Sequence, residues 1–312
     1  GQEEIGSPQL PAFIADQRDR LACDLVVSAD GGQWAEGQPA LHTGLRGLCA
    51  LEVTVTGARQ DLHSGSFGGA ILNPIQALCD LLSGLHDDAG RVTVEGFYDA
   101  VKPLNQEAIE RMRSISFDAD GFKAGIGVAD LYGEAGFTTY ERLWTRPTLE
   151  INGIGGGFQG EGTKTVLPGQ AHAKITCRLV ADQDPGEICR RVAAHLETHA
   201  SPAVRVTVTP EESHAWPYQI ATDHPGNLAA AAVHRKIFGR EPYVVGMGGS
   251  IPVCGIFLRE LGACTVNFAF GLKDENVHAP DEFFRLSSFR MGQRAYVHLL
   301  NELSRRDLTT VS

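Results

Sequence analysis

Apolar residues recur at two different spacings along the chain, and these spacings predict a succession of helices and strands. The stretch PAFIADQRDRL is typical of a short helix, and DLVVSAD is typical of a buried strand that ends at Asp30. LCALEVTVTGA alternates apolar and polar positions, which favours a half-buried strand. The intervening segment DGGQWAEGQPALHTGLRG is rich in Gly and Pro, so we expect a loop there.

The middle of the chain predicts an α+β unit. NPIQALCDLLSGLHD carries apolar residues at helical spacing, with Asn73 as N-cap and Pro74 at the first helical position. A second helix, DPGEICRRVAAHLETHA, is opened by Asp184 and Pro185. The segments TLEINGI, AHAKITCRLV and AVRVTVTP favour strands with hairpin-like spacing. This order predicts an antiparallel sheet with helices on one face, over residues 46–210.

The last part of the chain returns to α/β material. GNLAAAAVHRKIFG favours a helix, CTVNFAFG a buried strand, and FRLSSFRMGQRAYVHLLNELS a closing amphipathic helix. These elements are of the same kind as those before residue 45. The pattern therefore predicts one α/β domain, in two segments at 1–45 and 211–312, interrupted by an inserted α+β domain at 46–210.

The net charge indicates which partners are disfavoured, and the targeting signals and cysteines indicate the cellular location and the state of the thiols. The formal net charge of −11 disfavours a nucleic acid, which is bound through clustered Lys and Arg. We find no signal peptide and no apolar run long enough to span a membrane, so the sequence favours a cytoplasmic location without membrane contact. The seven cysteines are scattered without a C-x-x-C pair, and we interpret them as buried reduced thiols.

Carboxylates and one imidazole form the strongest candidate site. Glu3 and Glu4 are adjacent, Asp30 ends a predicted strand, and His278 follows CTVNFAFG in the loop DENVHAPDE. Open α/β sheets bind ligands at the carboxyl ends of their strands, and such side chains are typical of a hydrolytic zinc or manganese site. Taken singly, each of these residues is more often structural or simply solvated.

The glycine-rich segments leave two alternatives open. GIGGGFQGEGTKT lacks the adjacent Gly-Lys of a phosphate-binding loop, and GMGGSIPV contains no lysine, so nucleotide binding is disfavoured. Each segment is either an ordinary tight turn or a loop whose N–H groups bind an anion or a peptide backbone. His63 lies in a polar loop where exposure is the commoner outcome. Arg178 interrupts an apolar strand face, and its partner is either a substrate carboxylate or an internal Asp.

Seven segments, in this order, resemble the co-catalytic metallopeptidase superfamily of carnosine dipeptidases, aminoacylases, glutamate carboxypeptidases and succinyl-diaminopimelate desuccinylases. They are GQEEIGSP, SAD, RQDLHSGSFGG, GTKTVLPG, TCRLV, GGSIP and NVHAPDE. QDLHSG, GTKTV and GGSIP are similar to the cytosolic, carnosine-type dipeptidase branch in particular. The resemblance implies a zinc-peptidase-like α/β catalytic domain, here partial, with an inserted α+β lid that mediates dimerisation.

The resemblance also implies roles for individual residues. Glu3 is the general base, Glu4 and His278 hold one divalent metal ion, and Asp30 holds a second, zinc or manganese in each case. His63, supplied by the lid of the partner subunit, stabilises the developing oxyanion. Arg178 and Thr165 bind the substrate's terminal carboxylate or nearby backbone, also across the homodimer, and Gly249 and Ser250 line the pocket.

The chain departs from the family pattern in one respect, which affects whether we expect it to be active by itself. The family has an upstream H-x-D and a bridging Asp, both of which belong before Glu3. We therefore expect this chain to be the C-terminal portion of a longer dipeptidase, inactive and a poor metal binder by itself. Two alternatives stay open: an N-acyl-amino-acid amidohydrolase of the same superfamily, and a non-catalytic dimerisation module.

Overall fold

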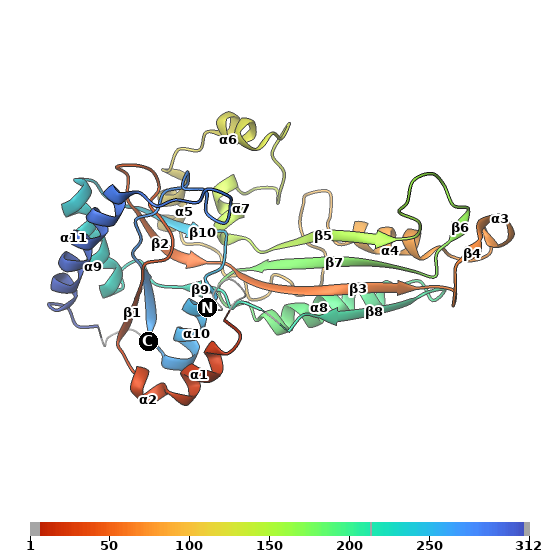
Figure 1. The fold of residues 1–312 in the computed structure, drawn as a ribbon, viewed down its shortest axis with the longest axis horizontal. Coiled ribbons are helices and arrows are strands. Elements are labelled where there is room, and N and C mark those ends of the chain that lie inside the picture. Colours follow the sequence, from red (N-terminus) through yellow and green to blue (C-terminus); the bar gives the residue numbers. More distant parts are fainter. Residues whose placement is uncertain (1–6, 213, 309–312) are drawn as a thin grey trace. The chain divides into compact units, whose positions relative to one another are not determined.

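A computed structural model describes residues 7–212 and 214–308, which divide into two units (Figure 1). Unit 1 comprises residues 7–45, 104–116 and 218–308, and unit 2 comprises residues 46–103 and 117–217. The expected Glu3 and Glu4 lie outside the described residues. The contact division differs from the expected domain ranges in one main respect: residues 104–116 belong to unit 1, because α5 (Gln106–Arg113) contacts β10 (Tyr243–Met247).

Unit 1 is built on a mixed sheet whose main path runs β1-β11-β2-β10, with β9 paired to β2. β1 and β11 are parallel neighbours, β11 meets β2 antiparallel at one residue pair, and β2 is parallel to β10. The strands and the remaining helices of this unit are α1 (Leu10–Asp16), α2 (Arg18–Leu21), β1 (Leu25–Ser28), β2 (Ala40–Leu45), β9 (Tyr218–Gln219), α9 (Pro225–Phe238), α10 (Pro252–Leu261), β11 (Cys264–Asn267) and α11 (Leu286–Leu303).

The core of unit 1 lies between this sheet and its helices. Phe268 and Val233 are buried in it, and α9 packs on α11 and on β11 and β2. Both α9 and α10 end at a glycine in the left-handed conformation, which a residue with a side chain adopts only at a cost. The sequence therefore determines where these two helices stop and the sheet resumes.

Unit 2 is an antiparallel four-stranded sheet, in the order β5-β7-β3-β8, with a separate two-stranded ladder of β4 and β6. Helices α4 and α8 pack along the long strands (Figure 1). The elements are β3 (Gly47–Thr56), β4 (Leu62–His63), α3 (Ser64–Phe67), α4 (Pro74–Ser83), α6 (Ala119–Ile126), α7 (Thr139–Thr145), β5 (Thr148–Gly156), β6 (Val166–Leu167), β7 (Gln170–Leu179), α8 (Pro185–Thr198) and β8 (Arg205–Pro210).

The alternation read from the sequence explains how unit 2 forms its core. Leu51 and Val53 of β3 are buried together with Ile175 of β7, whereas Glu52 and Lys174 point to the other face. Helices α4 and α8 begin where predicted, because Asn73 accepts a hydrogen bond from the Ile75 N–H and Asp184 accepts one from the Glu187 N–H. The expected α/β fold with an inserted antiparallel sheet and helices on one face is confirmed.

Two expectations from the sequence are wrong in detail. The Gly- and Pro-rich segment expected as a loop contains β2, because Ala40–Leu45 pairs along β10 despite the interruption of its apolar pattern by Thr43 and Gly44. All seven cysteines are free, but Cys23 and Cys79 are exposed rather than buried. In the described part of the chain, no helix is long and apolar enough to cross a membrane.

Candidate functional site

The turn after β1 holds Asp30 at the carboxyl end of the strand, as the sequence predicts. The Asp30 N–H donates to Ser28 Oγ over 3.2 Å, and the Asp30 side chain is exposed. The turn is bound to the segment after β11, because the Gln33 N–H donates to the Gly271 carbonyl over 2.8 Å. Gly32 is required there: a Cβ would lie 2.7 Å from the Gly271 oxygen.

His278 lies in the loop between β11 and α11, on the segment that follows Gly271. Its backbone has a φ of 59°, in the left-handed region, and its N–H donates to Glu282 Oε2 over 3.3 Å. Since β1 and β11 are parallel neighbours, both Asp30 and His278 follow the same edge of the sheet. The structure thus places the two candidate ligands on adjacent loops.

A buried carboxylate that the sequence analysis missed fixes the His278 loop. Glu275 is 2% exposed; its Oε2 accepts from the Leu272 N–H, and its Oε1 accepts from the backbone N–H and the guanidinium of Arg285. Arg285 also donates to Asp274 Oδ2 over 2.7 Å, and its guanidinium lies over the ring of Phe283. This hydrogen bond with Arg285 lowers the pKa of Asp274.

Gly249 and Ser250 lie between β10 and the first turn of α10. Nothing would lie within 4 Å of a Cβ at Gly249, so its backbone borders open space. Cys254, in α10, donates to Asn267 Oδ1 at the end of β11 over 3.9 Å. Burial and, to a smaller extent, the Asp30 charge raise the pKa of the Cys254 thiol to about 12. These contacts bring the start of α10 toward the strand ends that carry Asp30.

The described residues supply part of the donor set that a metal site needs. Asp30 and His278 offer a carboxylate and an imidazole, which suit zinc or manganese. Within residues 7–212 and 214–308, however, no group of three or more His, Cys, Asp or Glu side chains is arranged to hold a metal ion. The expected ligand Glu4 and the expected base Glu3 lie outside the described residues, so the assignment stays a prediction.

In unit 2, the structure brings His63 and Thr165 together. The two-residue strands β4 and β6 pair His63 with Val166, and the Ser64 N–H donates to the Thr165 carbonyl over 2.9 Å. Both side chains are exposed. His63 Nδ1 accepts from the Gly65 N–H over 3.1 Å, which leaves Nε2 as the nitrogen that can carry the proton of the neutral ring.

Arg178 is far from this pair in the same copy. β3 and β7 pair Thr56 with Gln170 and Leu48 with Arg178, so eight residues of β7 separate the two ends, about 26 Å at 3.3 Å per residue. The β4–β6 ladder follows the Thr56 end. Arg178 and Thr165 of one copy are therefore too far apart to bind the same carboxylate together. Their expected roles toward the substrate's terminal carboxylate or nearby backbone stay predictions.

Arg178 has a second arginine beside it on the open face of the sheet. Arg46 is 9% exposed and precedes Leu48, the residue paired with Arg178, by two positions. Burial first, then the charge of Arg178, lowers the pKa of Arg46 to about 10, while Glu150 acts in the opposite direction. Two neighbouring guanidinium groups create a positive potential that suits a carboxylate.

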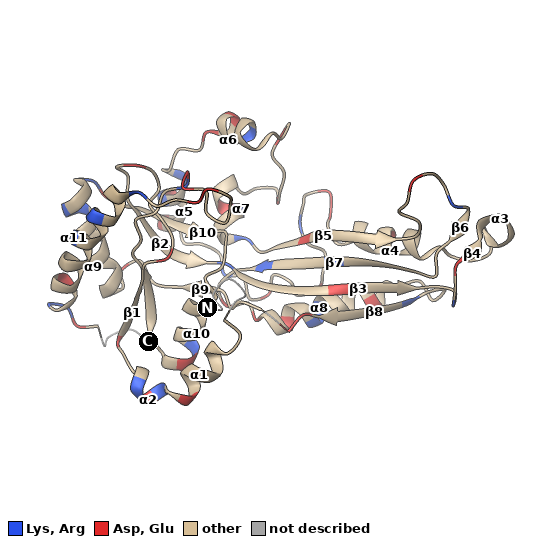
Figure 2. Cartoon of the chain, in the orientation of Figure 1, with Lys and Arg blue, Asp and Glu red and all other residues tan. Residues whose placement is uncertain are grey.

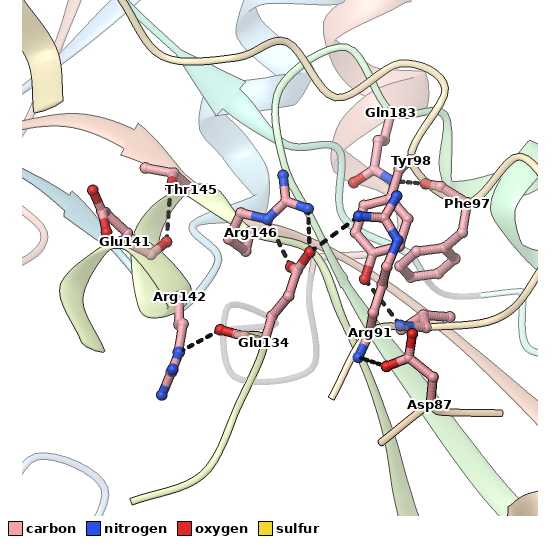
Figure 3. Close-up of polar contacts among 11 residues, drawn as sticks. Asp87, Arg91, Phe97, Tyr98, Glu134, Glu141, Arg142, Thr145, Arg146 and Gln183 are labelled. Carbon is pink, nitrogen blue, oxygen red and sulfur yellow. Dashed lines mark hydrogen bonds and ion pairs between the residues drawn. The ribbon is translucent and has the colours of Figure 1, made fainter. Parts of the chain in front are cut away.

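Charge elsewhere follows no single pattern. Figure 2 shows Lys and Arg interspersed with Asp and Glu over both units in this view. A second network missed by the sequence analysis is centred on Glu134, which Arg146 binds through two N–H groups and Arg91 approaches within 3.5 Å (Figure 3). Sequence offers no local signal for it, because Arg91 lies 43 residues before Glu134 and Arg146 lies 12 residues after it.

Comparison with known proteins supplies the family. Human Beta-Ala-His dipeptidase is 30% identical over 311 residues, which covers 97% of this chain and 61% of that protein. Cys-Gly metallodipeptidase dug1 of Schizosaccharomyces pombe is 28% identical over 97% of this chain and 65% of its own length. The M20 family metallo-carboxypeptidase Sso-CP2 of Sulfolobus solfataricus has a similar structure, with a TM-score of 0.84, 28% identity, and coverage of 98% and 69%.

The chain thus spans less than two thirds of the length of the two dipeptidases. A model of the peptidase dimerisation domain, M20_dimer, matches residues 43–204, more than half of the chain. These residues run from β3 to α8 and include the part of unit 2 that carries His63, Thr165 and Arg178, together with α5 of unit 1. The chain therefore belongs to the M20 family through its peptidase dimerisation domain.

Proposed function

We propose that the protein hydrolyses the peptide bond of dipeptides or short peptides with the help of divalent metal ions. The observation that carries the proposal is the match of 97% of the chain to metallodipeptidases, combined with Asp30 and His278 on adjacent loops of the unit 1 sheet. The exposed carboxylate and imidazole are the donor types such an enzyme needs.

In this proposal Glu4 and His278 hold one metal ion and Asp30 the other, zinc or manganese. When bound, the metal ions act as Lewis acids that bring a water molecule to a reactive state at neutral pH. Glu3 accepts the proton of that water and passes it to the leaving amine. Gly249 and Ser250 border the substrate, and the Glu275–Arg285 bonds keep the His278 loop in one geometry.

The active protein is proposed to be a homodimer formed through unit 2. His63 and Thr165 of one copy act on substrate bound by Arg178 of the other, since about 26 Å of strand separates these groups within one copy. The His63 Nε2–H donates to the developing oxyanion, and Arg178 binds the terminal carboxylate. Membership of the dimerisation domain family supports this arrangement.

We also place the protein in the cytoplasm, without a nucleic acid or a membrane as partner. All seven cysteines are free, which suits a reducing compartment. A deacylase of N-acyl amino acids is the second candidate, since it would use the same metal ions and base on a different acyl group.

The test compares dipeptides with N-acyl amino acids as substrates of the natural protein that carries these residues. We expect dipeptide turnover that chelator abolishes and zinc or manganese restores, and a loss of at least about a hundredfold on Asp30→Asn or His278→Gln. Turnover of the acyl substrates alone would instead establish the deacylase. Activity that survives complete metal removal contradicts the metal-dependent mechanism for both candidates. No turnover of either substrate class contradicts both and leaves a non-catalytic dimerisation module.

A further inference from the structure

Three polar side chains cross neighbouring strands in one row of the unit 1 sheet. β1 and β11 pair Ser28 with Asn267, and β11 and β2 pair Asn267 with His42. Directly paired residues place their side chains on the same face, about 5 Å apart. Asn267 is 2% exposed, so this row is a polar layer inside an otherwise apolar core.

Both ends of this row make hydrogen bonds to the backbone of the turn that carries Asp30. The Nε2 atom of His42 lies 2.9 Å from the Gly32 carbonyl oxygen. A carbonyl can only accept, so Nε2 carries the hydrogen. At the other end, Ser28 Oγ accepts from the Asp30 N–H. The turn is therefore fixed on both sides of Gly31, which has a φ of 111°.

The remaining polar atoms of His42 and Asn267 are complementary. Burial lowers the pKa of His42, and the Gly32 hydrogen bond offsets only part of this, so the ring is neutral at pH 7 with Nδ1 as an acceptor. Asn267 Oδ1 accepts from Cys254, which leaves Nδ2 as a donor. Both Nδ1 and Nδ2 are closed off from solvent without a partner among the described residues.

A direct bond does not join the two atoms, although their residues face each other across the strand pair. An unsatisfied buried donor or acceptor costs about 1–3 kcal/mol, and a buried water needs at least two such partners. One water between Nδ1 and Nδ2 satisfies both, since it donates to the first and accepts from the second.

We propose that His42 is a positioning residue for Asp30, with its tautomer fixed by one buried water that bridges His42 Nδ1 and Asn267 Nδ2. The bridge keeps the proton of the ring on Nε2, where it binds the Gly32 carbonyl. The importance of His42 for catalysis rests on the proposed function, whereas its effect on the geometry of the Asp30 turn does not. The positioning role and the proposed function can therefore fail separately.

The experiment reads the turn directly, by NMR of the full chain without metal. The Gln33 amide bonds Gly271 and reports on the turn. We expect His42→Phe to speed its hydrogen exchange by about tenfold, the effect of losing one hydrogen bond, and His42→Gln, which keeps an N–H donor, to restore most of the protection. We expect Asn267→Leu to move the Nδ1 nitrogen shift of His42 toward that of an unbonded ring.

His234→Phe is the matched control. His234 is also buried in unit 1 with an unpartnered Nδ1 among the described residues, but it packs on Phe268 and makes no contact with the turn that the structure records. It should leave Gln33 exchange unchanged. Wild-type exchange in His42→Phe, an equal increase in His234→Phe, or an unchanged Nδ1 shift in Asn267→Leu overturns the proposal.

Discussion

Arg146 binds Glu134 through two hydrogen bonds of 2.7 Å each, from Nε to Oε2 and from Nη2 to Oε1. Both side chains are largely buried, at 13% and 9% exposure. The Arg146 guanidinium also lies over the rings of Tyr98 and Phe137. The pair thus attaches the segment before α7 to the rest of unit 2 (Figure 3).

Glu134→Gln should destabilise unit 2 by roughly 3 kcal/mol, because the substitution leaves the buried guanidinium without its counter-charge. Chemical denaturation followed by tryptophan fluorescence measures the change. Glu52→Gln is the matched control, since Glu52 pairs with Lys174 at 3.8 Å with both side chains well exposed, and we expect a change below about 0.5 kcal/mol. Equal effects of the two substitutions would show that the Glu134 pair is not a structural anchor.

Gly32→Ala should disturb the Asp30 turn. A Cβ there would meet the Gly271 carbonyl oxygen at 2.7 Å, and backbone cannot move aside as a flexible side chain can. We expect a loss of about 1–3 kcal/mol in the free energy of unfolding, measured by thermal and urea unfolding. Gly44→Ala provides the comparison, since its nearest neighbour would be the Tyr218 oxygen at 3.9 Å. A Gly32 variant as stable as the Gly44 variant contradicts the close approach of the two turns.

The sequence predicts those parts of the fold that depend on local periodicity and capping. β3 and β7 alternate cleanly, and Asn73 and Asp184 cap α4 and α8 as expected. β2 escaped prediction because Thr43 and Gly44 break its apolar pattern, and its pairing with neighbouring strands, chiefly β10, makes it a strand. Its identity as a strand is a property of the sheet rather than of its own residues.

The residues of the candidate site also differ in whether a local sequence pattern could predict them. Asp30 and His278 could be chosen because each follows an apolar strand. Glu275 could not, because its role depends on Arg285, ten residues further on, and on burial that no local pattern reveals. The separation of Arg178 from Thr165 follows from strand register and length, which the sequence leaves undetermined until the partners of β7 are known.

Thiol reactivity should separate the two exposed cysteines from the four buried ones, whereas Cys264 is only partly exposed. Cys23 and Cys79 are exposed, whereas Cys49 faces Cys177 across the β3–β7 pair and contacts Cys189 inside the unit 2 core. A hydrogen bond with Cys177 raises the pKa of Cys49 first of all, and the bond with Cys49 raises that of Cys189.

Because the thiolate is the reactive species, a native-state titration at pH 8 with a disulfide reagent should label Cys23 and Cys79 fast. The four buried thiols should react only after unfolding. Cys79→Ser should remove one equivalent from the fast phase, and Cys177→Ser none. Rapid labelling of the buried group in the native protein would contradict the packing of the core.

The protonation of one buried histidine should account for part of the loss of stability of unit 1 at acid pH. His234 is 1% exposed on α9, among the rings of Phe238, Phe268 and Phe270. Burial, with a smaller effect of His42, lowers its pKa to about 4. An unfolded histidine has the ordinary value of 6.5, so the unfolded chain binds the proton first as the pH falls.

The stability that neutral His234 contributes is therefore complete above pH 6.5 and is lost between about pH 6.5 and 4, up to about 3 kcal/mol. Urea unfolding of unit 1 across this range measures the loss. In His234→Phe the slope of stability against pH should fall by about one proton, because phenylalanine keeps the ring contacts and cannot titrate. An unchanged slope would mean that His234 is already protonated in the folded protein, which its apolar surroundings oppose.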